Sequence, residues 1–160
     1  MPLLERLREF LDAKQAVYTH SLHKTAFTAR EVASAEHLAP AEVAKTVVVH
    51  TDAGYAMLMV PANRLVDFQE VRHELGFKSL RMATEHELSK LFPDCELGAM
   101  PPVGPLYMLP VYLDAALADK PLIAFNAGTH RDVIHMRTEE FQRVAHPVVV
   151  PLTRAEAAHG

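Results

Sequence analysis

Apolar residues recur at helical spacing near the start of the chain. Drawn as a helix, residues 3–13 place their leucines and Phe10 on one face. Thr28 is expected to cap a second helix because Glu31 follows at capping-box spacing, and Thr84 and Glu87 predict the same start for a helix over 84–91. Further helices are predicted over residues 65–75, ended by Gly76, and over 138–144.

Between these helices, short runs of β-branched and aromatic residues predict strands. Residues 43–50 are rich in valine, residues 55–60 are mostly apolar, and Asp-Ala-Gly at 52–54 joins them, so the pattern predicts a hairpin. Further strands are expected over 16–20, 110–113, 122–125 and 133–136. Helices and strands mix without strict alternation. The pattern therefore favours a mixed α/β (α+β) domain, with a mixed sheet surrounded by helices, over a doubly wound parallel sheet.

Length and composition predict one ordinary globular domain spanning residues 1–160. Hydrophobic residues make up 49% and charged residues 22%, and no repeat or low-complexity linker divides the chain. A lone cysteine excludes an internal disulfide, and the amphipathic start does not resemble a signal peptide. The apolar runs are too short to span a bilayer. We therefore expect a cytoplasmic protein without a membrane partner.

The charge balance limits the kind of nucleic acid that the protein can bind. The formal net charge is −4 with ten histidines counted as neutral, whereas general nucleic-acid binders are usually strongly basic. DNA is therefore not an expected partner. The balance remains compatible with an enzyme that holds only a single-stranded RNA terminus.

Lys45 is the first candidate for chemistry. It lies inside the valine-rich strand, whose two faces are both largely apolar, so its ammonium group must find an anionic partner, reach the strand's mouth or titrate at a lowered pH. The alternative, which the residue alone favours, is a strand-end lysine whose charge reaches solvent.

Two glycine-containing segments are further candidates. Gly98 to Gly104 is stiffened by prolines yet permits close backbone approach, and such a loop can aim N–H groups at a ligand oxygen. The segment Ala127 to His130 combines a tight turn with a histidine that can exchange a proton. An ordinary connection and a plain hairpin turn are the alternatives, and the second is favoured for 127–130 taken alone.

Other chemistries find little support. No metal-ligand spacing appears among the histidines, so we expect neither a metal nor a cofactor. Cys95 precedes the glycine loop but has no evident base partner, which favours a structural thiol over a nucleophile. The chain also lacks the GxSxG, P-loop and GxGxxG motifs of seryl hydrolases, NTPases and dehydrogenases.

Three motifs in order resemble the YbaK/ProX family of aminoacyl-tRNA deacylases, which is related to the editing domain inserted in many bacterial prolyl-tRNA synthetases. These motifs are Val43-Ala44-Lys45-Thr46-Val47-Val48-Val49, Gly98-Ala99-Met100-Pro101-Pro102 and Phe125-Asn126-Ala127-Gly128-Thr129-His130. The resemblance covers nearly the whole chain. It implies a strongly curved, mostly antiparallel mixed sheet. It also implies a trans-editing hydrolase that removes a small amino acid such as Ala, Ser, Thr or Cys from tRNA, most often tRNA for proline.

The resemblance also implies roles for individual residues. Lys45 is the expected key residue, and the Gly98–Pro102 loop is expected to orient the 3′ end of the charged tRNA. The residues expected to contact substrate are Thr46, Gly98, Ala99, Met100, Pro101, Pro102, Gly128, Thr129 and His130. Expected partners are the tRNA acceptor end and an aminoacyl-tRNA synthetase. A non-catalytic module that binds the charged tRNA end or a synthetase, and a ligand-binding domain unrelated to translation, remain as alternatives.

Overall fold

A computed structural model describes residues 3–156 of the chain. Its elements, in chain order, are α1 (Leu3–Ala13), β1 (Tyr18–Leu22), α2 (Ala29–Ala35), η1 (Pro40–Glu42), β2 (Ala44–Thr51), β3 (Gly54–Pro61), β4 (Arg64–Val66), α3 (Phe68–Leu75), β5 (Leu80–Met82), α4 (Glu85–Leu91), η2 (Gly104–Leu106), β6 (Val111–Asp114), α5 (Ala115–Ala118), β7 (Leu122–Asn126), β8 (Asp132–Arg137), α6 (Thr138–Ala145), β9 (Val148–Val150) and β10 (Thr153–Ala155).

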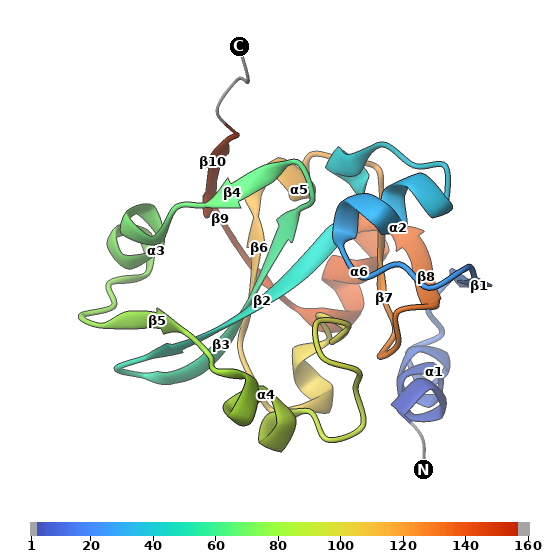
Figure 1. The fold of residues 1–160 in the computed structure, drawn as a ribbon, viewed down its shortest axis with the longest axis horizontal. Helices are drawn as coiled ribbons and strands as arrows, with labels where there is room; N and C mark the ends of the chain where they lie inside the picture. Colours follow the sequence, from blue (N-terminus) through green and yellow to red (C-terminus); the bar gives the residue numbers. More distant parts are fainter. Residues whose placement is uncertain (1–2, 157–160) are drawn as a thin grey trace.

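The strands form three hydrogen-bonded sheets. The largest has the order β5-β2-β3-β6-β9, a second has the order β1-β8-β7, and β10 pairs with β4. Among the described strands, the β3–β6 and β6–β9 pairs are parallel and the other pairs antiparallel, and an isolated parallel bridge joins Val43, directly before β2, to Ala124 of β7. Figure 1 shows β2 and β3 crossing the centre of the molecule with helices around them. The predicted mixed, mostly antiparallel fold with surrounding helices is confirmed.

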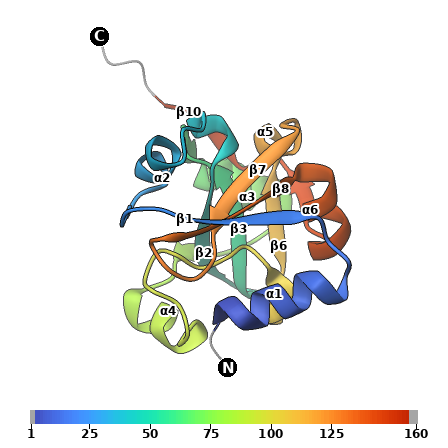
Figure 2. The same ribbon diagram turned by 90° about the vertical axis from the view of Figure 1, so that its right-hand side faces the viewer.

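The main core lies between the two larger sheets. Figure 2 shows β1, β8 and β7 crossing in front of β2 and β3, with α1 along their lower side. Buried side chains from both layers meet here, including Val48 and Met57 on the hairpin and Phe125 and Ile134 on the smaller sheet. Alternate residues of a strand point to opposite faces, so Ala44, Thr46 and Val48 share this inner face while Lys45 points to the other.

Most predicted elements occur at or near their expected positions, with one wrong boundary. The helix predicted from Leu65 begins instead at Phe68, because Leu65 pairs with Arg154 in the β4–β10 ladder. The Asp67 carboxylate accepts a hydrogen bond from the Glu70 N–H and caps α3 there. In the described part of the chain, no helix has the length and apolar character needed to cross a membrane.

Candidate functional site

The glycine-proline loop and the turn between β7 and β8 form one hydrogen-bonded unit. The Gly128 N–H donates to the Ala99 carbonyl at 2.9 Å, and the Glu96 N–H donates to the Gly128 carbonyl at 2.8 Å. The Glu96 carboxylate also accepts from the His130 N–H at 2.9 Å. Two segments about thirty residues apart are therefore held together by main-chain contacts.

Glycine is required at both ends of this unit. Gly98 has φ +86° and Gly128 has φ +97°, values that other residues rarely adopt. A Cβ atom on Gly98 would also lie 3.6 Å from Cε1 of His130, in van der Waals contact. The Gly98 N–H makes no hydrogen bond with any other residue of 3–156, so it is available to a ligand.

His130 is buried beneath this loop, and its surroundings fix its tautomer. Nε2 lies 2.8 Å from the Leu97 carbonyl, which can only accept, so Nε2 carries the proton in the neutral ring. Nδ1 then carries the lone pair, and it is buried without a partner among the described residues. The ring of Phe27 covers His130 with a centroid separation of 4.9 Å. His130 therefore presents an enclosed acceptor nitrogen rather than the surface histidine of a plain turn.

Asp132 holds the same turn from the side of the smaller sheet. Its carboxylate accepts from the Thr129 hydroxyl at 2.6 Å and lies 2.6 Å from Nε2 of His20. The Thr129 hydroxyl in turn accepts from the Asp132 N–H at 2.9 Å. Thr129 is thus used to shape the turn, a role that differs from the substrate contact expected of it.

Lys45 lies at the start of β2, next to β7. It shares a face with Val43, whose side chain packs with Ala124 and with Val32 of α2 in one buried cluster. The Lys45 side chain is partly buried on this α2 side of the sheet. Burial lowers the pKa of Lys45, the Glu156 carboxylate opposes that shift, and the Arg30 guanidinium adds to it.

Two charged side chains, Arg30 and Glu156, lie near Lys45, and the amide of Asn126 follows on the neighbouring strand. Arg30 and Glu156 form an ion pair, whereas Lys45 has no ion pair of its own within residues 3–156. Asn126 follows Ala124 by two residues on β7, so it lies level with Lys45, and its buried Oδ1 has no partner among the described residues. Sequence reasoning did not select Asn126, although an amide on an otherwise apolar strand was an available signal.

The described structure brings some of the predicted site residues together in the loop–turn unit and places the others apart from it. Gly98, Gly128, Thr129 and His130 belong to the loop–turn unit, and the Ala26 N–H, three residues before α2, donates to the His130 carbonyl at 3.0 Å. Ala26 also shares a buried cluster with Val43, two residues before Lys45. Of the other predicted contacts, Thr46 lies on the inner face, and Ala99, Met100, Pro101 and Pro102 are buried, although the Ala99 carbonyl takes part in the loop–turn unit. Met100 reaches only a small cavity of about 70 Å³ beside Cys95.

In the described part of the chain, Cys95 is not an activated thiol, and the acidic and histidine side chains do not gather into a metal site. Burial raises the pKa of the Cys95 thiol, which lies 3.4 Å from the Tyr107 hydroxyl, so the thiol stays protonated near neutral pH. Within residues 3–156, no three His, Cys, Asp or Glu side chains are grouped so that they could hold a metal ion.

Comparison with known proteins gives consistent matches. The Aminoacyl-tRNA editing domain family matches residues 23–144, most of the chain. A proline–tRNA ligase of Heliobacterium modesticaldum is 33% identical over 87 residues, which are 54% of this chain and 15% of that protein. The chain thus spans a small fraction of the length of this curated relative.

Solved structures extend the likeness to nearly the whole chain. A candidate trans-editing enzyme for prolyl-tRNA synthetase superposes with a TM-score of 0.83 at 25% identity, covering 97% of this chain and 99% of the other. A hypothetical protein also gives a TM-score of 0.83 at 18% identity, covering 93% and 99% of the two chains. The second match bears on the fold alone.

Proposed function

Because the chain belongs to the aminoacyl-tRNA editing domain family, we propose that it is a deacylase that removes a wrongly attached small amino acid from tRNA. The family match supports an editing role, and the likeness to a candidate trans-editing enzyme supports action on free mischarged tRNA. The proposed substrates are alanyl, seryl, threonyl or cysteinyl esters on tRNA for proline or a related tRNA. Such editing belongs where tRNAs are charged, in the cytoplasm, beside an aminoacyl-tRNA synthetase.

The feature that supports this proposal is the loop–turn unit of Gly98, Gly128 and His130 at the end of β7, the strand that bridges to the residue directly before β2. An aminoacyl ester is already activated, so its hydrolysis requires positioning and stabilisation of the developing negative charge. The free Gly98 N–H is a suitable donor to the oxyanion, because φ +86° turns the backbone sharply at that residue. Lys45 would hold a phosphate or the terminal adenosine as a cation. The substrate's own ribose hydroxyl would help to activate the water.

His130 and Asn126 would orient the aminoacyl group. Each offers a buried acceptor that lacks a partner in the described chain, and the substrate's α-ammonium group is a donor. A ligand reaches His130 only when Phe27 moves, and Phe27 is free to do so because 66% of its surface is exposed. One methylene is worth only about 1–3 kcal/mol of attraction, so small amino acids are hard to separate from proline by attraction alone. We therefore propose that the substrate space here is narrow and excludes proline by size.

A deacylation panel tests the proposal. Wild-type protein and Lys45→Ala are incubated with alanyl-, seryl-, threonyl- and cysteinyl-tRNA for proline, and released amino acid is measured. We expect the wild type to release at least one of them and Lys45→Ala to be slower by about a hundredfold, the loss typical of one stabilising group. Lys78→Ala, on an exposed lysine far along the sheet, is the matched control and should retain the wild-type rate.

Two outcomes would reject parts of this proposal. If tRNA binds without release of amino acid, the protein is a binding module instead of an enzyme. If Lys45→Ala keeps the wild-type rate, Lys45 has no part in the mechanism.

A further inference from the structure

Two surface cavities adjoin on the side of the molecule that carries η1, α5 and the start of α6. One, of about 270 Å³, is lined by residues that include Ala41, Pro61 and Arg64. The other, of about 350 Å³, is lined by residues that include Arg137 and Gln142. Asp119 and Lys120 line both cavities, so the two are neighbours on the surface, and together they are called the groove here.

One end of this groove lies close to the candidate site. Pro61 pairs with Ala44, the residue directly before Lys45, and Ala41 precedes Val43 by two residues. The other end lies at the start of α6, where β8 ends. The Gly128 turn lies at the opposite end of β8. A chain that left the Lys45 region along the surface would therefore enter the groove.

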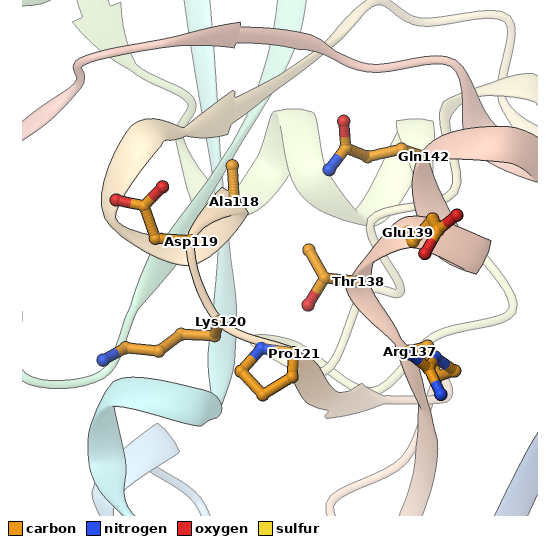
Figure 3. A pocket seen from close by; sticks show the side chains of 8 residues that line it. All are labelled: Ala118, Asp119, Lys120, Pro121, Arg137, Thr138, Glu139 and Gln142. Atoms are coloured by element: carbon orange, nitrogen blue, oxygen red, sulfur yellow. The ribbon is translucent and has the colours of Figure 1, made fainter.

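Three cationic side chains are spaced along the groove. Arg64 is fixed by hydrogen bonds from Nε and Nη2 to Thr153, at 2.7 and 3.3 Å, which leaves its other N–H donors free. Lys120 and Arg137 form no ion pair within residues 3–156. Figure 3 shows them on either side of Pro121 at the groove floor.

The acidic residues of the groove do not neutralise these cations. Asp119 and Glu139 also line it, but in Figure 3 the Asp119 carboxylate points away from the Lys120 ammonium group. The start of α6 adds little positive charge, because the Thr138 N–H donates to the Pro121 carbonyl at 3.1 Å and Glu139 and Glu140 lie in the first turn. Cationic side chains without ion pairs of their own, one of them held in place as Arg64 is, are the chemistry that recognises phosphate.

We propose that this groove binds the backbone phosphates of the tRNA acceptor strand just upstream of the CCA end, through Arg64, Lys120 and Arg137. The proposal rests on the proposed function, which places the CCA end near Lys45. It also explains how a chain of net charge −4 can hold tRNA: the contact is a local row of cations rather than a basic surface.

The test compares two substrates with a double variant, Lys120→Ala/Arg137→Ala. The substrates are a full-length mischarged tRNA and a short aminoacylated oligonucleotide that ends in CCA and has no stem. We expect kcat/KM for the full-length tRNA to fall about tenfold because KM rises. The slope of log kcat/KM against the logarithm of salt concentration should also become less steep, by about one unit for each removed cation. The rate with the short oligonucleotide should not change.

A second double variant, Lys14→Ala/Lys78→Ala, removes the same net charge elsewhere and should leave both rates unchanged. If the first double variant loses kcat/KM equally on both substrates, or loses none on the full-length tRNA, the proposal that the groove binds tRNA is wrong. If the wild type deacylates nothing, the proposed function fails. Fluorescence anisotropy with uncharged tRNA then tests, without any deacylation, whether the groove binds tRNA. About tenfold weaker binding by the first variant supports it, and equal binding, or no binding by the wild type, overturns it.

Discussion

At the scale of single residues, the site depends on groups whose polar atoms are buried with few partners. Lys45 is partly buried and unpaired, and Asn126 and His130 each keep a buried acceptor without a partner in the described structure. Buried polar atoms without partners cost free energy, so a protein retains them mainly where a ligand supplies the missing contact. We therefore propose that these three residues line the substrate site and that a substrate completes their contacts.

The lowered pKa of Lys45 predicts the pH dependence of activity. Because burial favours its neutral form, Lys45 loses its charge at a lower pH than the usual 10.5. If the cation binds substrate, kcat/KM falls on the alkaline side below pH 10.5, and in Lys45→Arg any remaining activity persists to higher pH. The measurement is kcat/KM against pH, corrected for uncatalysed ester hydrolysis. Matching alkaline limbs for the two proteins would contradict a cationic role.

Sequence reasoning at this scale singled out Lys45 as an unusual residue but could not predict its surroundings. A charged residue on an apolar strand is visible in one line of sequence. Its neighbours Arg30 and Glu156 come from segments more than a hundred residues apart. The fixed tautomer of His130 likewise depends on the Leu97 carbonyl, a contact that no local pattern encodes.

At the scale of elements, the glycine-proline loop is held in place by backbone conformation as much as by hydrogen bonds. Gly98→Ala should destabilise the protein by about 1–2 kcal/mol because φ +86° is unfavourable for alanine. It should also lower deacylation by about ten- to a hundredfold, since the backbone relaxes from this φ and moves the Gly98 N–H away from the substrate. Urea unfolding and initial rates measure the two effects.

Gly76→Ala provides the control for this loop. Gly76 has φ +69° and open space where a Cβ would stand, so the same substitution costs similar stability there but touches nothing. We expect unchanged activity. Equal effects of both substitutions on the rate would show that the loss in Gly98→Ala reflects instability alone.

The elements themselves were predicted to the extent that their signals are local. The capping box of Thr84 and Glu87 and the cap at Thr28 are confirmed, because each involves residues three apart. The strands β4, β5, β9 and β10 were missed. Each has only three residues and exists because a distant segment pairs with it, as β10 does with β4.

At the scale of the whole molecule, a buried carboxylate ties the C-terminal segment to the large sheet. Asp114, at the end of β6, accepts from the Leu152 N–H and from the Thr153 hydroxyl, both at 2.7 Å. Asp114→Ala should lower the free energy of unfolding by about 2–3 kcal/mol, because a buried N–H loses its partner. Asp119→Ala, at an exposed carboxylate, should change it by less than about 0.5 kcal/mol. Similar urea midpoints for both variants would contradict this role.

The central claim is that this fold releases small amino acids from mischarged tRNA at a site containing Lys45. The most direct measurement is a single-turnover time course with excess protein, alanyl-tRNA for proline and correctly charged prolyl-tRNA in parallel. The account predicts rapid release of alanine by the wild type, slow release by Lys45→Ala, and stable prolyl-tRNA throughout. Alanine that stays attached to tRNA at the uncatalysed rate in the presence of wild-type protein, with the other small amino acids equally retained, would contradict it.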